Sequence, residues 1–368
     1  MSSFETTFSK RLEALQDAKQ LRTLVSTDYL GHGLIERHHK KLMSFGSNDY
    51  AGLADHPEVI QAAQMALDTY GAGSRASQLV SGYSALMETL EKELADYAAC
   101  ESACLFGSGY LANIGVIPAL VGKGDVILAD RLVHACMIDG SRLSGAAFHR
   151  FYHNDHEHLS TLLETHRSPY RHCLILVERV YSMDGDVAPL DNILEIAKHY
   201  NAWVLVDDAH GMGVLPPHHG DYLHLGTLSK GLGSYGAYVC GPLSVIEYLK
   251  SSARSLMFST SLPPASVAAA LTALRIIKQD PKRMQHGLDM ARYFTEKMRM
   301  KMAQSAIVPL IIGDEDKAIA LSKRLEDDGL YVPAIRPPTV PPQSSRLRFA
   351  FSIWHDKAIV DKVIGIIK

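Results

Sequence analysis

"GTLSKGLGSYGAYVCG", residues 226–241, sets a single lysine, Lys230, among small residues and just before a short apolar run. Its glycines, Gly231, Gly233 and Gly236, match the G-x-G-x-x-G spacing of a dinucleotide-binding loop. Such a loop needs a strand before it and a helix after it. Here a strand-like run follows, and no acidic residue stands suitably about 20 residues on. We therefore interpret the glycines as positions that allow close backbone approach around Lys230.

The local sequence leaves two interpretations open for Lys230. The first is a solvated surface lysine, which is what most lysines are. The second rests on its neighbours, because Ser229, Gly231 and the leucines on either side are small or apolar. A lysine in a dry pocket loses its proton more readily and can act as a Schiff-base nucleophile. The rest of the sequence is needed to choose between these two interpretations of Lys230.

The composition narrows the class of protein. The chain has 368 residues, a formal net charge of −3 and 47% hydrophobic residues, enough for one large core and a second domain. Its charges are mixed in sign, so nothing favours a nucleic-acid or anionic-membrane partner. No apolar run is long enough to span a bilayer. The five cysteines form no C-x-x-C pair, which predicts reduced thiols and a cytoplasmic location.

Short apolar runs alternate with helical patterns through residues 46–240, which predicts a large α/β domain with a mostly parallel sheet. The runs expected to be buried strands are 104–106, 126–130, 174–178, 203–208 and 237–241. A helix is expected to start at Pro57 and to end just before Gly71. Further helices are expected around the leucine stripe at 86, 90 and 94 and over residues 190–200.

Two flanking segments complete the expected organisation. Residues 1–45 should form an N-terminal helical segment, since Phe4, Phe8, Leu12 and Leu15 recur at helical spacing and charges rule out a signal peptide. Residues 241–368 should form a smaller α+β domain that begins with a long connecting helix.

That connecting helix is expected to run from about Pro264 toward Met302, by the period of its hydrophobic residues. The segment RPPTVPP, residues 336–342, is too rich in proline to join a central strand.

Polar groups follow several of the expected strands, where ligands of parallel α/β sheets bind. In VLVDDAHG, residues 204–211, the strand ends in Asp207 and Asp208, and His210 follows. A carboxylate there can keep a ring nitrogen protonated, and the alternative is a helix-capping aspartate. The cluster also resembles a metal site, but no further histidine or acidic group stands at ligand spacing, so we expect no metal.

Three more strand ends carry candidate groups. Glu178 ends a buried strand, and a polar turn over residues 182–186 follows it. Gly107, Ser108 and Gly109 precede a helical pattern, and the backbone amides at a helix start suit a phosphate. His134 lies just past another strand, where it is either a structural histidine or a ring that stacks on a planar cofactor.

The segment YHNDHEHL, residues 152–159, has the composition of a metal-binding tract. Its histidines, His153, His156 and His158, do not have the i, i+4 spacing of ligands on one helix face. We therefore favour a solvated loop.

Together these motifs resemble the α-oxoamine synthases, a family of fold type I enzymes that use pyridoxal 5'-phosphate (PLP). The matching segments are FGSNDYAGLADHP, VSGYSALMETLEKELADY, ADRLVHA, VYSMDGDVAPL, VDDAHGMGVL, GTLSKGLGSYGAYVCG and FSTSLPP. They occur in family order from about Phe45 to Pro264, which is far more specific than any single motif. AIRPPTVP, followed by RLRFAFS, and the HND segment are most similar to the branch that condenses L-alanine with a pimeloyl thioester in biotin biosynthesis.

The resemblance implies a role for each matching residue. Lys230 is the expected Schiff-base lysine, Asp207 the partner of the pyridine nitrogen, and His134 the group that stacks on the ring. The other expected cofactor-binding residues are Gly109, Tyr110, Ser182, His210, Thr227, Thr260 and Ser261, the last two acting from the partner subunit of a homodimer. The expected substrate-binding residues are Asn48 and Arg348 for the amino-acid carboxylate, and Arg22 and Thr339 for the acyl substrate.

This sequence departs from the family pattern at several positions. Tyr110 stands where phenylalanine is usual, Cys136 and Ser229 replace frequent serine and glycine, and Arg75 and Ala76 stand where glycines are common. The departures at Arg75 and Ala76 concern the shape of the acyl pocket.

Three alternatives therefore stay open. The first is another α-oxoamine synthase that uses glycine or serine, such as a glycine C-acetyltransferase. The second is a PLP-dependent aminotransferase or lyase, and the third is a subunit that only stabilises a catalytic partner. The carrier of the acyl group, coenzyme A or acyl carrier protein, is also left open.

Overall fold

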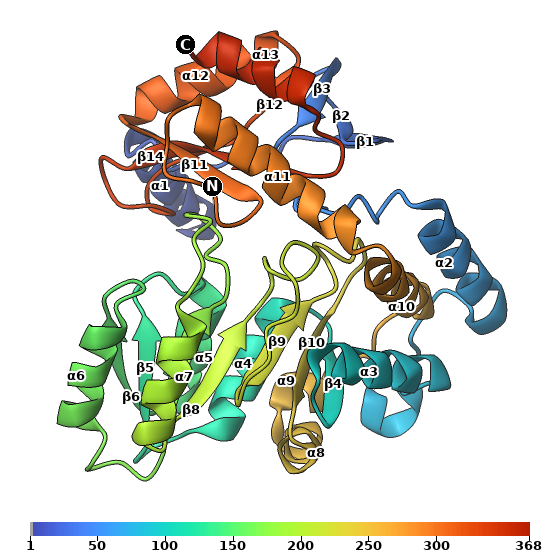
Figure 1. Cartoon of the computed structure of the whole chain (residues 1–368), viewed down its shortest axis with the longest axis vertical. Coiled ribbons are helices and arrows are strands. Elements are labelled where there is room, and N and C mark those ends of the chain that lie inside the picture. The colour runs from blue at the N-terminus through green and yellow to red at the C-terminus, as the bar shows by residue number, and fades with distance from the viewer. Residues whose placement is uncertain (1–2) are drawn as a thin grey trace. The chain divides into compact units, whose positions relative to one another are not determined.

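The computed structural model describes residues 3–368, and the chain divides into two compact units (Figure 1). Among the described residues, the larger unit contains residues 48–308 and 350–357, and the smaller one contains residues 3–47, 309–349 and 358–368. The predicted boundary after residue 240 does not coincide with this division, since residues 241–308 belong to the larger unit. No helix within residues 3–368 is long and apolar enough to cross a membrane.

A seven-stranded sheet forms the centre of the larger unit, in the order β4-β10-β9-β8-β7-β5-β6. Its strands are β4 (Ser102–Phe106), β5 (Val126–Asp130), β6 (Ala147–Phe151), β7 (Cys173–Glu178), β8 (Trp203–Asp207), β9 (Leu223–Thr227) and β10 (Ala237–Gly241). Only β10 runs antiparallel to its neighbours, β4 and β9. This confirms the predicted mostly parallel sheet. β6 and β9 were not expected, because AFHRF and LHLGT interrupt the apolar run with polar residues or glycine.

Helices cover both faces of this sheet, which explains why its central strands are apolar throughout (Figure 1). The helices of the larger unit are α2 (Pro57–Tyr70), α3 (Ala85–Ala98), α4 (Gly109–Leu120), α5 (Ala135–Ser144), α6 (His156–His166), α7 (Leu190–His199), α8 (Leu243–Ser252), α9 (Arg254–Met257), α10 (Pro264–Gln279) and α11 (Pro281–Lys297), with a π-helical turn at Gln78–Gly82, and not all of them contact the sheet. α2 begins at Pro57 and ends before Gly71, whose φ of 78° suits glycine, as predicted.

The predicted continuous helix from Pro264 toward Met302 is wrong, because it is two helices. α10 ends at Gln279, and Asp280 adopts φ −123° and ψ 75°, outside the helical region. Pro281 then starts α11. A proline disfavours the helical conformation in the residue before it and lacks the N–H that a helix interior needs.

The smaller unit combines residues from both ends of the chain. It holds α1 (Ser3–Asp17), α12 (Glu315–Asp327) and a sheet of β1 (Asp28–Gly31), β2 (Leu34–Arg37), β3 (Lys40–Ser44) and β12 (Leu330–Tyr331). It also holds β13 (Ala334–Ile335) and most of β11 (Ile307–Gly313) and β14 (Ser345–Ala350), which form a second sheet, and most of α13 (Lys357–Ile367). Residues 1–45 are therefore not a purely helical segment, since three strands follow α1. Residues 336–342 form no strand, as their prolines predict.

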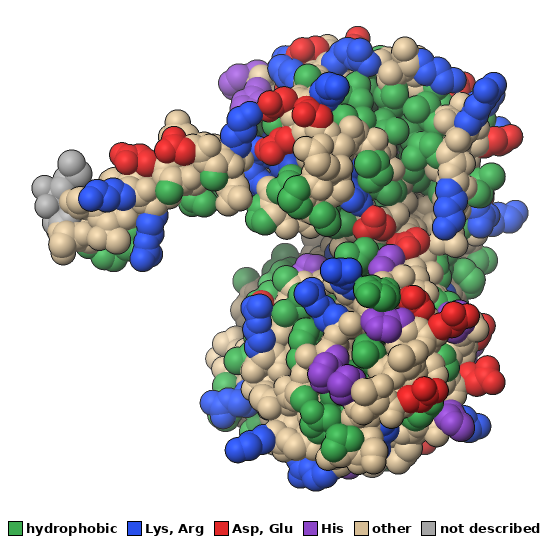
Figure 2. Space-filling view, turned by 90° about the vertical axis from the view of Figure 1, so that its left-hand side faces the viewer, with side chains coloured by type: hydrophobic (Ala, Val, Ile, Leu, Met, Phe, Trp, Pro, Cys, Tyr) green, Lys and Arg blue, Asp and Glu red, His purple; other side chains and the backbone are tan. Residues whose placement is uncertain are grey.

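α1 has no buried residue, although its apolar stripe is as predicted. Phe4 and Leu12 are 70% and 53% exposed. Figure 2 shows α1 extending from the rest of its unit with charged and hydrophobic side chains on its surface.

The glycines of residues 226–241 do allow close backbone approach. A Cβ on Gly231 would lie 2.1 Å from the carbonyl oxygen of Met212, and one on Gly233 would lie 2.3 Å from the backbone nitrogen of Ala54. The loop that carries Lys230 is thus pressed against two other segments of the larger unit, and glycine is required for the fit.

Gly231→Ala should lower the free energy of unfolding by about 1–3 kcal/mol, because the added methyl group overpacks against the backbone of Met212. The measurement is chemical denaturation of the variant against the wild-type protein. Gly73→Ala is the matched control, since a Cβ there meets nothing within 4 Å. Equal loss in both variants, or none in Gly231→Ala, would contradict the packing described here.

Candidate active site

A cavity of about 220 Å³ lies at the carboxyl-end edge of the large sheet. It is lined by Ser108, Gly109, Tyr110, His134, Cys136, Glu178, Asp207, Ala209, His210, Thr227, Ser229 and Lys230. Glu178, Asp207 and Thr227 are the last residues of β7, β8 and β9, and the other residues follow strand ends closely. This is where open α/β sheets bind ligands.

Lys230 enters a chain of polar contacts across the cavity wall. Its Nζ lies 2.9 Å from His210 Nε2, and His210 Nδ1 lies 2.7 Å from the hydroxyl of Tyr50. The same hydroxyl is 3.1 Å from Asn48 Oδ1. Lys230 is therefore directed into the cavity by a buried histidine, which favours the chemical interpretation of this lysine over the surface one.

Asp207 is buried and is held by two donors. Asn113 Nδ2 donates to its Oδ2 at 2.9 Å, and the backbone N–H of Ala209 donates to its Oδ1 at 2.9 Å. The adjacent Asp208 takes no part in the cavity, because it pairs with Arg179 Nη1 at 3.0 Å. Asp207 thus lines the cavity, whereas Asp208 holds the surrounding loops together.

Asn113 was missed from the sequence, although a signal was present. It is the only polar side chain between Leu111 and Leu120 on α4, and it is fully buried. A lone amide on an otherwise apolar helix needs a buried partner, and Asp207 is that partner.

One end of the cavity has the character of an anion site. Ser108 caps α4, and its Oγ accepts from the backbone N–H of Leu111 at 3.2 Å. Gly109 and Tyr110 form the first turn of this helix, whose free amides and dipole favour negative charge. The hydroxyls of Thr227 and Ser229, 2.7 Å apart, lie in the same cavity lining.

His134 and Glu178 line the cavity in environments that oppose charge. Burial lowers the pKa of His134, and Asp207 offsets this only in part. The backbone N–H of Cys136 donates to His134 Nδ1 at 3.2 Å, so the neutral ring carries its proton on Nε2.

From the sequence, Glu178 is recognisable only as the end of a buried strand. Burial raises its pKa well above the ordinary value, and the charge of Asp207 raises it further. The backbone N–H of Ser182 donates to its Oε2 at 3.3 Å, whereas its Oε1 has no hydrogen-bond partner among residues 3–368. A bound polar ligand can supply that partner.

These groups fit PLP by their chemistry. An amine, a buried carboxylate, a helix start suited to phosphate and a neutral imidazole line one cavity. Seven of the predicted cofactor residues lie here: Gly109, Tyr110, His134, Asp207, His210, Thr227 and Lys230. Within residues 3–368 no group of three His, Cys, Asp or Glu side chains is arranged to hold a metal ion.

The other predicted residues do not line this cavity. Ser182 contributes its backbone N–H to Glu178. Thr260 is exposed, whereas the buried Ser261 hydroxyl donates to Met87 Sδ at 3.1 Å in its own chain. Arg22, Thr339 and Arg348 belong to the smaller unit, where Arg22 Nη2 donates to the carbonyl of Pro337 at 2.8 Å and Arg348 is buried on β14.

The expected solvated loop at residues 152–159 is wrong in part. Asp155 caps α6, which begins at His156, and His153 is partly buried between two carboxylates.

Comparisons with known proteins agree with this geometry. Residues 40–367 match the model of the family described as aminotransferase class I and II. The chain is 52% identical over 359 residues to 8-amino-7-oxononanoate synthase of Methylobacterium sp. (strain 4-46), covering 98% of this chain and 95% of that protein.

Two solved structures give the same fold. Serine palmitoyltransferase from S. paucimobilis with bound PLP and myriocin superposes with a TM-score of 0.90 at 29% identity, covering 98% of this chain and 95% of that one. 8-amino-7-oxononanoate synthase from Francisella tularensis gives 0.75 at 26% identity, covering 89% and 96%.

His134 should titrate below 6.5, because burial disfavours its charged form. The measurement is a pH titration of histidine-labelled protein by NMR, with the His134 signal assigned from its absence in His134→Asn. A midpoint at or above 6.5 would contradict the environment described for this ring.

Proposed function

This chain belongs to the aminotransferase class I and II family and groups with the 8-amino-7-oxononanoate synthases, and on that premise we propose its reaction and the role of each residue. It condenses L-alanine with a pimeloyl thioester, releasing the thiol and CO2. The observation that carries this is the 52% identity over nearly the whole chain, together with one cavity that holds Lys230 and Asp207. The family resemblance drawn from the motifs is confirmed, and so is PLP as cofactor.

When bound, PLP supplies an electron-withdrawing ring that stabilises negative charge at the Cα of the amino acid. Lys230 would hold the cofactor through its amine, and the same amine would accept the Cα proton of alanine. His210 Nε2, 2.9 Å from Nζ, orients that amine. Because the histidine is itself fixed by Tyr50, Lys230 is preorganised for both tasks.

Asp207 is proposed to bond the ring nitrogen. Its two oxygens are already oriented by Asn113 and Ala209, so no reorganisation is needed when positive charge forms beside it. The first turn of α4 with Thr227 and Ser229 is proposed to hold the phosphate. His134, whose pKa is lowered by burial, would stack on the cofactor ring.

The remaining predicted roles stay proposals. Asn48 and Arg348 would bind the amino-acid carboxylate, and Arg22 and Thr339 the acyl substrate. Thr260 and Ser261 would reach the phosphate in a homodimer, where the Ser261 hydroxyl has to exchange its Met87 contact for the anion. The five free cysteines support a reducing, cytoplasmic setting for the enzyme.

A second candidate rests on a specific observation. The serine palmitoyltransferase structure superposes better than the Francisella synthase, with TM-scores of 0.90 and 0.75. A synthase that uses serine or glycine with a different acyl thioester shares the same lysine and aspartate, and pockets discriminate a single methylene by only about 10–200-fold.

Purified protein should release thiol and CO2 fastest from L-alanine with pimeloyl-coenzyme A or the pimeloyl carrier protein. The assay compares kcat/KM for alanine, glycine and serine, each with pimeloyl and palmitoyl thioesters. Preference for serine with the long chain would support the second candidate. Amino-group transfer without thiol release would contradict both.

Lys230→Ala should lose turnover by at least about a hundredfold, since it removes the proposed proton acceptor. It should also lose the visible absorption that PLP shows when linked to a protein amine. Lys198→Ala, an exposed lysine on α7, is the control and should keep both. Ordinary turnover in Lys230→Ala would refute the assignment of this residue.

A further inference from the structure

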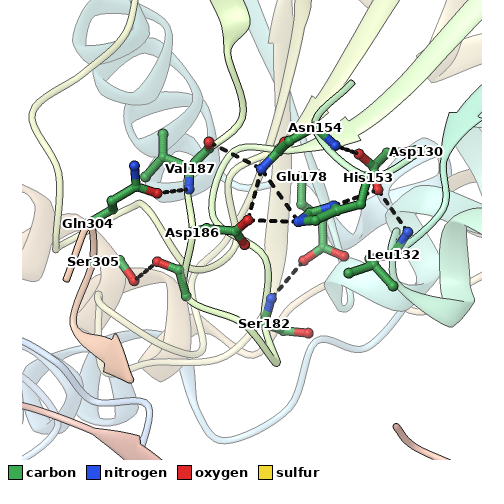
Figure 3. A network of polar contacts seen from close by, with 11 residues as sticks. Asp130, Leu132, His153, Asn154, Glu178, Ser182, Asp186, Val187, Gln304 and Ser305 are labelled. Atoms are coloured by element: carbon green, nitrogen blue, oxygen red, sulfur yellow. Dashed lines mark hydrogen bonds and ion pairs between the residues drawn. The ribbon is translucent and has the colours of Figure 1, made fainter. Parts of the chain in front are cut away.

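We propose that His153 is a positioning residue that joins two loops next to the cavity. The loop after β5 leads to His134, and the backbone of the loop after β7 binds Glu178. The ring of His153 bridges Asp130, at the end of β5, and Asp186, in the loop after β7 (Figure 3). Neither the motifs nor the proposed reaction gives this histidine a task. The inference rests on the proposed function, since it concerns the same cavity.

The first of these loops runs from Asp130 to His134. Asp130 has no exposed surface, and its Oδ1 accepts from the backbone N–H of Leu132 at 2.8 Å. Its Oδ2 accepts from the backbone N–H of Asn154 at 2.8 Å, and His153 Nδ1 lies 3.0 Å from its Oδ1. One carboxylate thus fixes both the turn that presents His134 and the segment that carries His153.

The second loop runs from Ser182 to Asp186. His153 Nε2 lies 2.7 Å from Asp186 Oδ2, which also accepts from Asn154 Nδ2 at 2.9 Å. The same loop donates the backbone N–H of Ser182 to Glu178. A displacement of Asp186 therefore shifts a hydrogen bond of a residue that lines the cavity.

The loop after β7 is also held on the side away from His153, so it is fixed by contacts on both sides. Ser305 Oγ donates to the carbonyl of Gly185 at 2.7 Å, and Gln304 Oε1 accepts from the backbone N–H of Val187 at 3.1 Å. The ring of Tyr181 meets His153 edge-on, with centroids 4.4 Å apart. His153 is the cationic member of this arrangement.

The geometry requires a charged ring. Both ring nitrogens face carboxylate oxygens, and only the doubly protonated imidazole can donate from both. Burial opposes the charge, but the hydrogen bonds and charges of Asp130 and Asp186 outweigh it and raise the pKa of His153 to about 10. Without the cation, two carboxylates would be left facing each other across the gap between the loops.

His153→Gln tests this, with the holoenzyme as the sample. Displacement of the two loops should change the visible circular dichroism of bound PLP and lower kcat by about tenfold or more. The KM for alanine should stay within about twofold, because uniform substrate binding is untouched. His149→Gln is the matched control, since His149 lies on the neighbouring β6 and its ring stacks on His166.

A double variant separates positioning from packing. His153→Gln with Asp186→Asn removes one of the two facing carboxylates, so it should recover part of the lost kcat and dichroism. A packing defect would instead become worse with a second substitution. If His153→Gln does not fold, Asp186→Asn alone should show the same changes in dichroism and kcat.

Stability supplies a readout without turnover. The pKa of His153 is 6.5 in the unfolded chain and about 10 in the folded protein. The stabilisation that this difference provides is complete below pH 6.5 and disappears as the pH rises toward 10. The difference in melting temperature between the wild-type protein and His153→Gln should therefore shrink over that range. Asp130, Asp186 and the edge of Tyr181 are the groups that face the ring.

The inference is overturned if folded His153→Gln keeps wild-type kcat and dichroism, if His149→Gln shows equal losses, or if the double variant is worse than the single one. Absence of alanine-dependent thiol release by the wild-type protein would instead refute the proposed function. The dichroism and melting readouts would still test His153 in that case.

Discussion

Parallel strands of one sheet bring their carboxyl ends to the same edge, and every group in the cavity depends on that constraint. The register of β7 and β8 sets Glu178 opposite Asp207, and β9 ends beside them at Thr227. The strands are buried on both faces, so their ends are the first places where polar side chains can reach a ligand. The loop that carries Lys230 is then held against this edge by Gly231 and Gly233, where no larger residue fits.

Two neighbouring carboxyl groups are given different tasks by what surrounds them. Asp207 accepts hydrogen bonds from Asn113 and Ala209, which suits an anion beside a cationic ring. Glu178 is buried, and its pKa is raised, which favours the protonated form. Glu178 can therefore hold a proton in the cavity while it lies opposite Asp207 in the sheet. His153 contributes to the same arrangement, because it fixes the two loops on either side of Glu178, after β5 and after β7.

Much of the fold and of the candidate site could be predicted, because burial and strand order produce recognisable patterns in a sequence. The apolar runs ending in Asp207 and Glu178 located the sheet edge, and the small residues around Lys230 located its loop. The sequence does not predict β6 and β9 as strands, because AFHRF and LHLGT have no continuous apolar character. The hydrophobic period continues across Pro281, so it does not reveal that α11 begins there, although the proline itself marks a helix start. The burial of His153 could not be predicted, since its partners Asp130 and Asp186 are 23 and 33 residues away.

We propose above all that the Lys230 amine holds the cofactor while Asp207 faces its ring. Borohydride reduction of the PLP-loaded protein, followed by peptide mass mapping, tests it directly. We expect one reduced pyridoxyl adduct, on Lys230, and none on the exposed lysines. An adduct on a different lysine, or none after saturation with PLP, would contradict it.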